Sequence, residues 1–129
     1  MLGGKILLVD RDPKSRAHFA AGLKRAGYAV HEVGTGRGAL RAMERGRRPV
    51  AVVLDSSLPD MRGVDLLGRI LSLDADLPVV IHTAAWDCCD DFGCWGARAV
   101  LTKSSDPLAL ARCVERVIAE PTRRHENVG

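Results

Sequence analysis

The sequence predicts a doubly wound α/β domain built on a five-stranded parallel sheet. Apolar runs of strand length alternate five times with segments of helical character along the 129 residues. Asp-Pro pairs, which typically open helices, precede two of these segments. Neither an internal repeat nor a low-complexity segment interrupts the alternation, and parallel strands joined in this way require right-handed crossovers. We therefore expect helices on both faces of one sheet.

The first half of the chain contains three of the expected strands and two of the helices. The strands are predicted at residues 5–10, 28–33 and 50–55. The first helix begins at Asp12-Pro13, carries Phe19 and Leu23 on its apolar face, and ends at Gly27. A second helix follows the turn at 34–36. The strand at 50–55 is apolar on both faces, which is typical of a central strand covered by helices on each side.

The second half of the chain continues the alternation. Beyond a loop at 56–62, the expected elements are a helix at 63–73, a strand at 78–83, a short irregular helix at 87–95, a strand at 99–103 and a helix from 107 to about 118. Residues 119–129 are expected to fray as a C-terminal tail. The whole chain, residues 1–129, is thus predicted to be one domain with its core at about 5–118.

Composition sets limits on location and partners. A chain of 129 residues with 47% hydrophobic residues fits one compact core, so we expect no separate output module. No apolar run approaches the roughly 20 residues that a membrane helix needs, and the first residues do not resemble a signal peptide. We therefore expect a cytoplasmic protein without membrane contact. The net charge of +3 falls short of a nucleic-acid signature, so no direct DNA binding is expected.

Polar side chains stand where the predicted strands end. Asp10 and Asp55 close two strands, Thr83 closes a third, and Lys103 closes the last. Ligands of such sheets bind outside the carboxyl ends of the strands, so these side chains are expected to share one crevice. A carboxylate that accepts a phosphoryl group needs a cation, a hydroxyl and an ammonium nearby. The carboxylates and a loop carbonyl are also oxygen ligands of the kind that Mg²⁺ prefers.

From residue 5 to about residue 118 the sequence resembles the receiver domains of two-component response regulators, which have a CheY-like, flavodoxin-like (βα)5 fold. The matching positions are Asp10 for the first of two paired acids, Asp55 for the phosphoacceptor, Pro59 and Gly63 for the following loop and helix start, Thr83-Ala84 for the switch hydroxyl and its small neighbour, and Lys103 for the lysine. Each motif is weak alone, whereas their order and spacing together are specific.

The resemblance implies a role for each of these residues in a phosphorelay. Asp55 would be phosphorylated by a sensor histidine kinase or a phosphotransfer protein, and Thr83 and Lys103 would bind the phosphoryl oxygens. Asp10, Asp55 and the backbone carbonyl of Ser57 would hold Mg²⁺, with Asp12 as a further candidate ligand. The surface of the fourth helix, fifth strand and fifth helix would signal to a separate downstream protein. The domain would not be an enzyme beyond its own phosphorylation, and its oligomeric state stays open, a homodimer included.

Arg11 is the main departure from the receiver pattern. Receivers usually carry a second acid at this position as a direct metal ligand, and a positive charge roughly 5 Å from a divalent ion costs several kcal/mol even at an effective dielectric near 20. Two outcomes stay open at this point. Arg11 swings out while Asp12 contributes to the metal, or Arg11 pairs with Asp55 and replaces the cation. The second outcome makes the chain a pseudo-receiver, a phosphorylation-independent protein-interaction module.

Other motifs have competing interpretations. The sequence Asp10-Arg11-Asp12 resembles the D-x-D of haloacid-dehalogenase phosphatases, although the residues expected after it are missing, and Asp12-Pro13 is also a helix-cap signature. The late cysteines Cys88, Cys89 and Cys94, together with His82, lack the spacing of a structural zinc site and indicate reduced thiols. Arg37, Arg41, Arg45, Arg47 and Arg48 form a basic ridge, interpreted as a solvated helix face. Trp86 and Trp95 lead us to hypothesise a partner-specific surface between them.

Overall fold

A computed structural model of the chain describes residues 3–46, 48–84, 96–103 and 106–120. Its five strands form one parallel sheet in the order β2-β1-β3-β4-β5. The strands are β1 (Gly4–Val9), β2 (Tyr28–Val33), β3 (Ala51–Leu54), β4 (Val79–Thr83) and β5 (Ala99–Thr102). All five predicted strands are confirmed, and three end one residue earlier than predicted because the chain turns away before Asp10, Asp55 and Lys103.

The helices pack on both faces of this sheet, as expected. They are α1 (Pro13–Arg25), α2 (Gly36–Glu44), α3 (Gly63–Leu73) and α5 (Pro107–Ala119). Asp12 and Asp106 cap α1 and α5, each accepting a hydrogen bond from the backbone N–H two residues later. Gly27 follows the end of α1 with a φ of 105°, a left-handed conformation that glycine adopts without strain. The helix expected at 87–95 and the tail at 121–129 lie outside the described residues.

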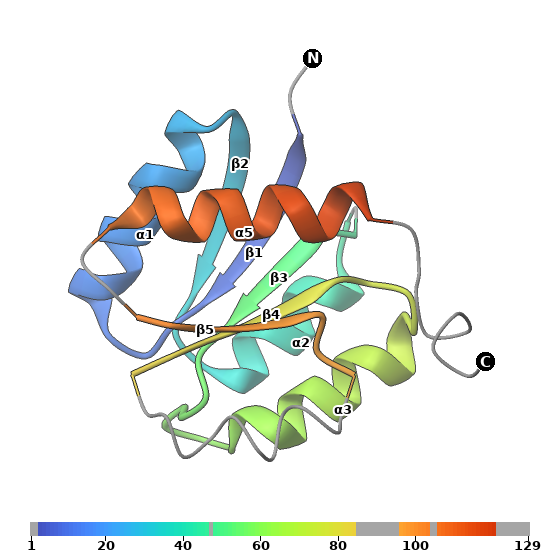
Figure 1. Cartoon of the computed structure of the whole chain (residues 1–129). Coiled ribbons are helices and arrows are strands. Elements are labelled where there is room, and N and C mark those ends of the chain that lie inside the picture. The colour runs from blue at the N-terminus through green and yellow to red at the C-terminus, as the bar shows by residue number, and fades with distance from the viewer. Residues whose placement is uncertain (1–2, 47, 85–95, 104–105, 121–129) are drawn as a thin grey trace.

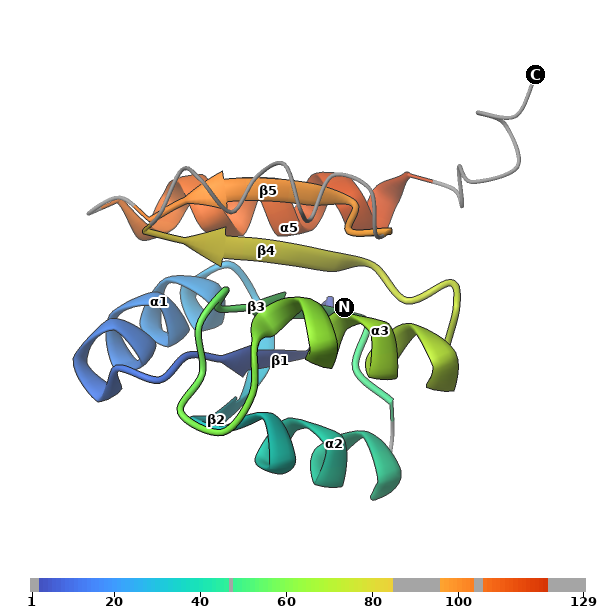
Figure 2. The same cartoon turned by 90° about the horizontal axis from the view of Figure 1, so that it is seen from below.

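Two apolar layers hold the helices to the sheet. On one face, α1 and α5 pack on β1, β3 and β4 around Leu23, Val53 and Leu110. On the other face, α2 and α3 pack around Met43, Leu54 and Leu66. Figures 1 and 2 show this arrangement, with α1 and α5 together on one side and α2 and α3 on the other. Strand β3 contributes side chains to both layers and is fully buried, which explains its uninterrupted apolar sequence.

The strand order creates a crevice between β1 and β3. From β1 the chain crosses to β2 on one side, whereas β3, β4 and β5 follow on the other side. The loops after β1 and β3 therefore diverge, and ligands of open α/β sheets bind at such a point. Asp10 and Asp55 are the residues that follow these two strands.

Among the described residues, no helix is both long enough and apolar enough to cross a membrane.

Candidate functional site

Two buried carboxylates lie at the crevice. The side chain of Asp10 follows β1 and that of Asp55 follows β3, and the residues are only 1% and 7% exposed. Both are placed by the ladder between neighbouring strands, since Val9 lies opposite Leu54 and the backbone N–H of Asp55 donates to the Val9 carbonyl at 2.9 Å. Two acids at the ends of adjacent buried strands need a cation between them.

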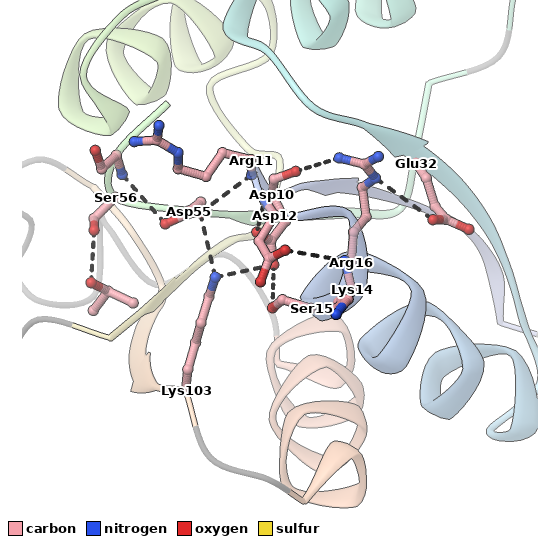
Figure 3. Close-up of polar contacts among 12 residues, drawn as sticks. Asp10, Arg11, Asp12, Lys14, Ser15, Arg16, Glu32, Asp55, Ser56 and Lys103 are labelled. Carbon is pink, nitrogen blue, oxygen red and sulfur yellow. Dashed lines mark hydrogen bonds and ion pairs between the residues drawn. The ribbon is translucent and has the colours of Figure 1, made fainter. Parts of the chain in front are cut away.

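Lys103 supplies that cation. Its Nζ lies 3.1 Å from Oδ2 of Asp10 and 3.4 Å from Oδ2 of Asp55 (Figure 3). Lys103 follows β5, and its backbone N–H donates to the Thr83 carbonyl at 2.7 Å, which ties the start of its side chain to β4. The ends of three strands thus converge on one ammonium group.

The two carboxyl groups differ in their environments. Burial by itself would raise the pKa of Asp10, but hydrogen bonds from the Ser15 hydroxyl at 2.7 Å and the Asp12 backbone N–H at 2.9 Å, together with Lys103, hold that pKa below its usual value. Burial raises the pKa of Asp55; Lys103 opposes this rise and the negative charge of Asp10 adds to it. Among the described residues, the hydrogen bonds that Asp55 accepts are all long, at 3.4 Å, and come from the backbone N–H groups of Arg11 and Ser57 and from Lys103. Asp55 is therefore the less stabilised carboxylate of the two, as suits a nucleophile.

Thr83 lies at the same end of the sheet and is fully buried. Its Oγ1 is 2.7 Å from Oγ of Ser56, the residue directly after Asp55 (Figure 3). This contact joins the end of β4 to the loop that carries the carboxylate. The structure thus brings Thr83 close to the chain segment around Asp55, as the sequence predicted.

The loop after β3 passes close to the start of α3. Gly63 N–H donates to the Ser56 carbonyl at 2.9 Å, and a side chain at position 63 would place its Cβ 2.7 Å from the Asp55 carbonyl oxygen. Only glycine allows the two segments to approach in this way. The glycine of the receiver pattern therefore has a direct structural reason in this chain.

Arg11 and Asp12 agree with one half of the first arrangement that the sequence left open, an exposed Arg11, and not with the pairing of the Arg11 guanidinium with Asp55. Arg11 is exposed, and its backbone N–H, not its guanidinium, donates to Asp55. Figure 3 shows its side chain extending toward the same side of the site as Asp55 and Ser56. Asp12 is exposed and uses Oδ1 to cap α1 at Lys14 N–H, 3.2 Å away. Lys103 contacts Asp55 in place of Arg11, whose pairing with Asp55 was one of the two arrangements left open, and the helix-cap interpretation of Asp12 is confirmed.

These residues fit a magnesium ion poorly. Asp10 already accepts hydrogen bonds on both oxygens, and Lys103 occupies the space between the two carboxylates. Among the described residues, no group of three His, Cys, Asp or Glu side chains could hold a metal. Two negative charges from Asp10 and Asp55 are balanced by two positive charges from Lys103 and Arg11, so the formal charge of these side chains is zero. A neutral site offers little attraction to a divalent cation.

Three contributors to the site were not anticipated. Ser15 hydrogen-bonds Asp10, Ser56 hydrogen-bonds Thr83, and Nη1 of Arg16 donates to the Asp10 carbonyl at 2.7 Å. Arg16 is also 3.8 Å from Glu32 on β2. Ser15 and Arg16 lie in the first turn of α1, so their proximity to Asp10 follows from the sharp turn at Asp12-Pro13. The contacts of Ser15 and Arg16 with Asp10 could therefore have been predicted from that turn.

Asp60 connects the loop after Asp55 to α2. Its carboxylate accepts from the backbone N–H groups of Gly36 at 2.8 Å and Arg37 at 3.0 Å, and these hydrogen bonds lower the pKa of Asp60. The first N–H groups of a helix otherwise lack partners. We expect Asp60→Ala to lower the free energy of unfolding by about 1 kcal/mol in urea titrations. Asp60→Asn keeps an acceptor oxygen, so its free energy of unfolding is expected to lie between those of the wild-type protein and Asp60→Ala. An Asp60→Ala protein with unchanged stability would show that the contact contributes nothing.

Several sequence hypotheses concern residues that the structure does not describe. The three late cysteines of the considered zinc set and both tryptophans lie there. His82, the fourth member of that set, is buried against Phe19 with the ring centres 4.5 Å apart. It is therefore part of the core between α1 and β4.

Among curated proteins, this chain is similar to bacterial transcriptional and response regulators. PrrA of Mycobacterium tuberculosis, a transcriptional regulatory protein, is 34% identical over 122 residues, which are 93% of this chain and 51% of PrrA. The DNA-binding response regulator MtrA of Mycolicibacterium smegmatis is 38% identical over 86 residues, which are 67% of this chain and 37% of MtrA. The chain thus spans about half or less of the length of these relatives.

Solved structures and a family model agree with this comparison. The response regulator TrrA of Thermotoga maritima, crystallised in complex with Mg²⁺ and BeF, superposes with a TM-score of 0.82 at 26% identity, over 89% of this chain and 99% of TrrA. The model of the response regulator receiver domain matches residues 6–115, a range that includes Asp10, Asp55, Thr83 and Lys103. The fold, the convergence of these four side chains and the match over most of the sequence lead to one conclusion: the chain belongs to the response regulator receiver domain family.

Proposed function

We propose that this chain is a phosphoacceptor receiver in which Asp55 takes a phosphoryl group from a phosphohistidine. The observation that carries the proposal is the shared contact of Lys103 with Asp55 and Asp10, at 3.4 and 3.1 Å. It leaves an incompletely stabilised carboxylate beside an ammonium group, with the hydroxyl of Thr83 at the end of the next strand.

The transfer follows from the position of these groups. An oxygen of Asp55 attacks phosphorus, an O–P bond forms, the P–N bond to the donor imidazole breaks, and the imidazole takes up a proton as it leaves. Lys103 then moves from the carboxylates to an oxygen of the phosphoryl group. Thr83 exchanges its contact with Ser56 for another phosphoryl oxygen, which draws the end of β4 inward.

Arg11 can supply positive charge near the phosphoryl group during this step. An aspartyl phosphate adds negative charge to the crevice, and the exposed guanidinium at its mouth can approach it with a two-pronged contact. The proposed phosphoryl transfer therefore depends more on Lys103 than on a bound Mg²⁺ ion. The Mg²⁺ ligands that the sequence suggested are Asp10, Asp55, Ser57 and Asp12. TrrA was crystallised with Mg²⁺, whereas this chain has arginine where an acidic ligand is usual.

The partners of such a domain are proteins. We infer a sensor histidine kinase or a phosphotransfer protein upstream and a separate protein downstream, in the cytoplasm. MtrA, which binds DNA, is longer than this chain, which covers 37% of it. We also propose that the residues of this chain do not bind DNA directly, since their net charge of +3 falls short of a nucleic-acid signature.

The test is phosphorylation by acetyl phosphate, followed by intact-mass measurement, with and without Mg²⁺. We expect the mass to rise by one phosphoryl group in the wild-type protein and not at all in Asp55→Asn. Asp60→Asn is the matched control, because it makes the same change in the same loop away from the crevice. A mass rise that persists in Asp55→Asn would place the phosphoryl group elsewhere.

A second candidate function is favoured by the neutral charge of the site. Because Lys103 contacts both buried acids and its charge and that of Arg11 together balance them, the domain can keep one conformation without phosphorylation. It would then be a protein-interaction module. Unchanged mass with acetyl phosphate and an unchanged spectrum with beryllofluoride, both in the presence of Mg²⁺, would favour this second function.

A further inference from the structure

A groove beside α2 gathers four basic side chains that the phosphoryl chemistry does not use. It has a volume of about 230 Å³ and is lined by Lys5, His31, Gly38, Arg41, Ala42 and Arg45. Lys5 lies near the start of β1, five residues before Asp10, which is about 16 Å along an extended strand. The groove is therefore separate from the crevice at the strand ends.

The register of β1 and β2 places two of these basic groups on the same face. Lys5 lies opposite Ala29 and Leu7 lies opposite His31. Because side chains alternate along a strand, Lys5 and His31 share the face on which Leu7 packs toward α2 and α3. Helix α2 has only nine residues, and it leaves Ala29 and His31 exposed at the edge of the sheet. Figure 2 shows α2 running beside this edge.

The other two basic groups lie in and directly after α2, which also contributes a floor of small residues. Arg41 is in the last turn of the helix, and Arg45, four residues later, caps its C-terminal end with an extended backbone. Both side chains are exposed and line the groove. Gly38 and Ala42 have the same spacing and leave room beneath them. Two like charges that line one groove repel each other, and a bound anion would offset that repulsion.

Two other arginines of the basic ridge are engaged elsewhere, whereas Arg47 lies outside the described residues. Arg48 contacts the Leu73 carbonyl at 3.2 Å and Asp74 at 4.0 Å, and Arg37 lies at the Asp60 cap, where its charge helps to lower the pKa of that carboxyl. By contrast, none of the ion pairs found among the described residues involves Lys5, His31, Arg41 or Arg45. Positive charge without a carboxylate partner is thus concentrated in the groove.

We propose that this groove binds an acidic segment of a protein partner. The guanidinium groups of Arg41 and Arg45 can each hold a carboxylate through two hydrogen bonds. The groove is smaller than the roughly 300 Å³ at which small-molecule pockets begin, and it suits the side chains of one extended chain. Strand β2 forms the edge of the sheet, where the backbone of such a segment can add hydrogen bonds. Duplex DNA presents a broad convex surface that a narrow recess between helix and sheet matches less well.

The proposal is tested with a fluorescently labelled oligoglutamate peptide, whose affinity is measured by anisotropy. The double variant Arg41→Glu/Arg45→Glu is expected to bind at least about tenfold more weakly, because repulsion replaces two contacts. The control is Arg69→Glu/Arg112→Glu, which changes the net charge equally at exposed positions of α3 and α5 and is expected to change the affinity less than about twofold. Arg41→Gln/Arg45→Gln serves the same purpose if charge reversal perturbs folding.

Three results would overturn the proposal. Failure of the wild-type protein to bind the peptide at physiological salt would show that the groove is not a binding site for acidic segments. An equal loss of affinity in the two charge-reversal variants would show that net charge alone causes the binding. Tighter binding of duplex DNA than of the peptide at the same salt concentration, lost in Arg41→Glu/Arg45→Glu, would assign the groove to nucleic acid instead.

Discussion

Replacing Arg11 with aspartate is expected to tighten Mg²⁺ binding by at least about tenfold, measured by isothermal titration calorimetry. The four side chains of the crevice have a formal charge of zero, and the substitution changes this to minus two. One unit charge at roughly 5 Å from another contributes about 3 kcal/mol at an effective dielectric of 20, and solvent reduces that value for an exposed group such as Arg11. We therefore expect the Kd of Arg11→Asp for Mg²⁺ to be about ten- to a hundredfold lower than that of the wild-type protein.

The control for this experiment is Arg69→Asp on α3, which makes the same charge change at an exposed position of the helix. It is expected to leave the affinity for Mg²⁺ unchanged within about twofold, because screening limits interactions beyond about 10 Å. Wild-type protein that already binds Mg²⁺ as tightly as Arg11→Asp would contradict the argument. In that case Arg11 would not oppose the metal, and the poor fit deduced from the donor set would be wrong.

The second large effect concerns His82 and the pH dependence of stability. His82 is 2% exposed, and burial, with the positive charge of Lys103 adding to it and Asp10 opposing it, lowers its pKa to about 4. In the unfolded chain the imidazole titrates near 6.5. Between these two values the unfolded state binds the additional proton, so stability falls as the pH decreases from about 6.5 to about 4. The full loss is roughly 3 kcal/mol at 1.36 kcal/mol per pKa unit.

Urea unfolding at about pH 7 and about pH 5 measures most of this change. His82→Leu is expected to remove the contribution of His82 from the difference between the two conditions, whereas His31→Gln, at an exposed histidine of β2, is expected to retain it. The comparison uses the slope with pH, so an overall change in stability caused by repacking against Phe19 does not affect it. Equal pH dependence in wild-type and His82→Leu proteins would show that His82 is not buried in its neutral form.

Much of the fold could be predicted from local sequence because local rules acted without conflict. The Asp-Pro pairs, Gly27 and the apolar run of β3 each indicated an element that the structure confirms. The site could be predicted to the level of its residues, since parallel strands bring their carboxyl ends to one edge of a sheet. The predicted ends of β1, β3 and β5 were one residue too late, because Asp10, Asp55 and Lys103 continue the sequence pattern of each strand but lie in the crevice beyond it.

The sequence by itself determined the fold class, the residues at the strand ends and the presence of an arginine where receivers usually have an acid. Only the tertiary structure decided which cation neutralises Asp55. Arg11 is next to Asp10 in sequence, yet Lys103, 48 residues after Asp55, makes the contact. The physical reason is that Arg11 enters the turn before α1 and directs only its backbone N–H at Asp55, whereas the end of β5 holds a long side chain aimed at the crevice. The basic groove was decided in the same way, because the pairing register brings Lys5 and His31 to Arg41 and Arg45.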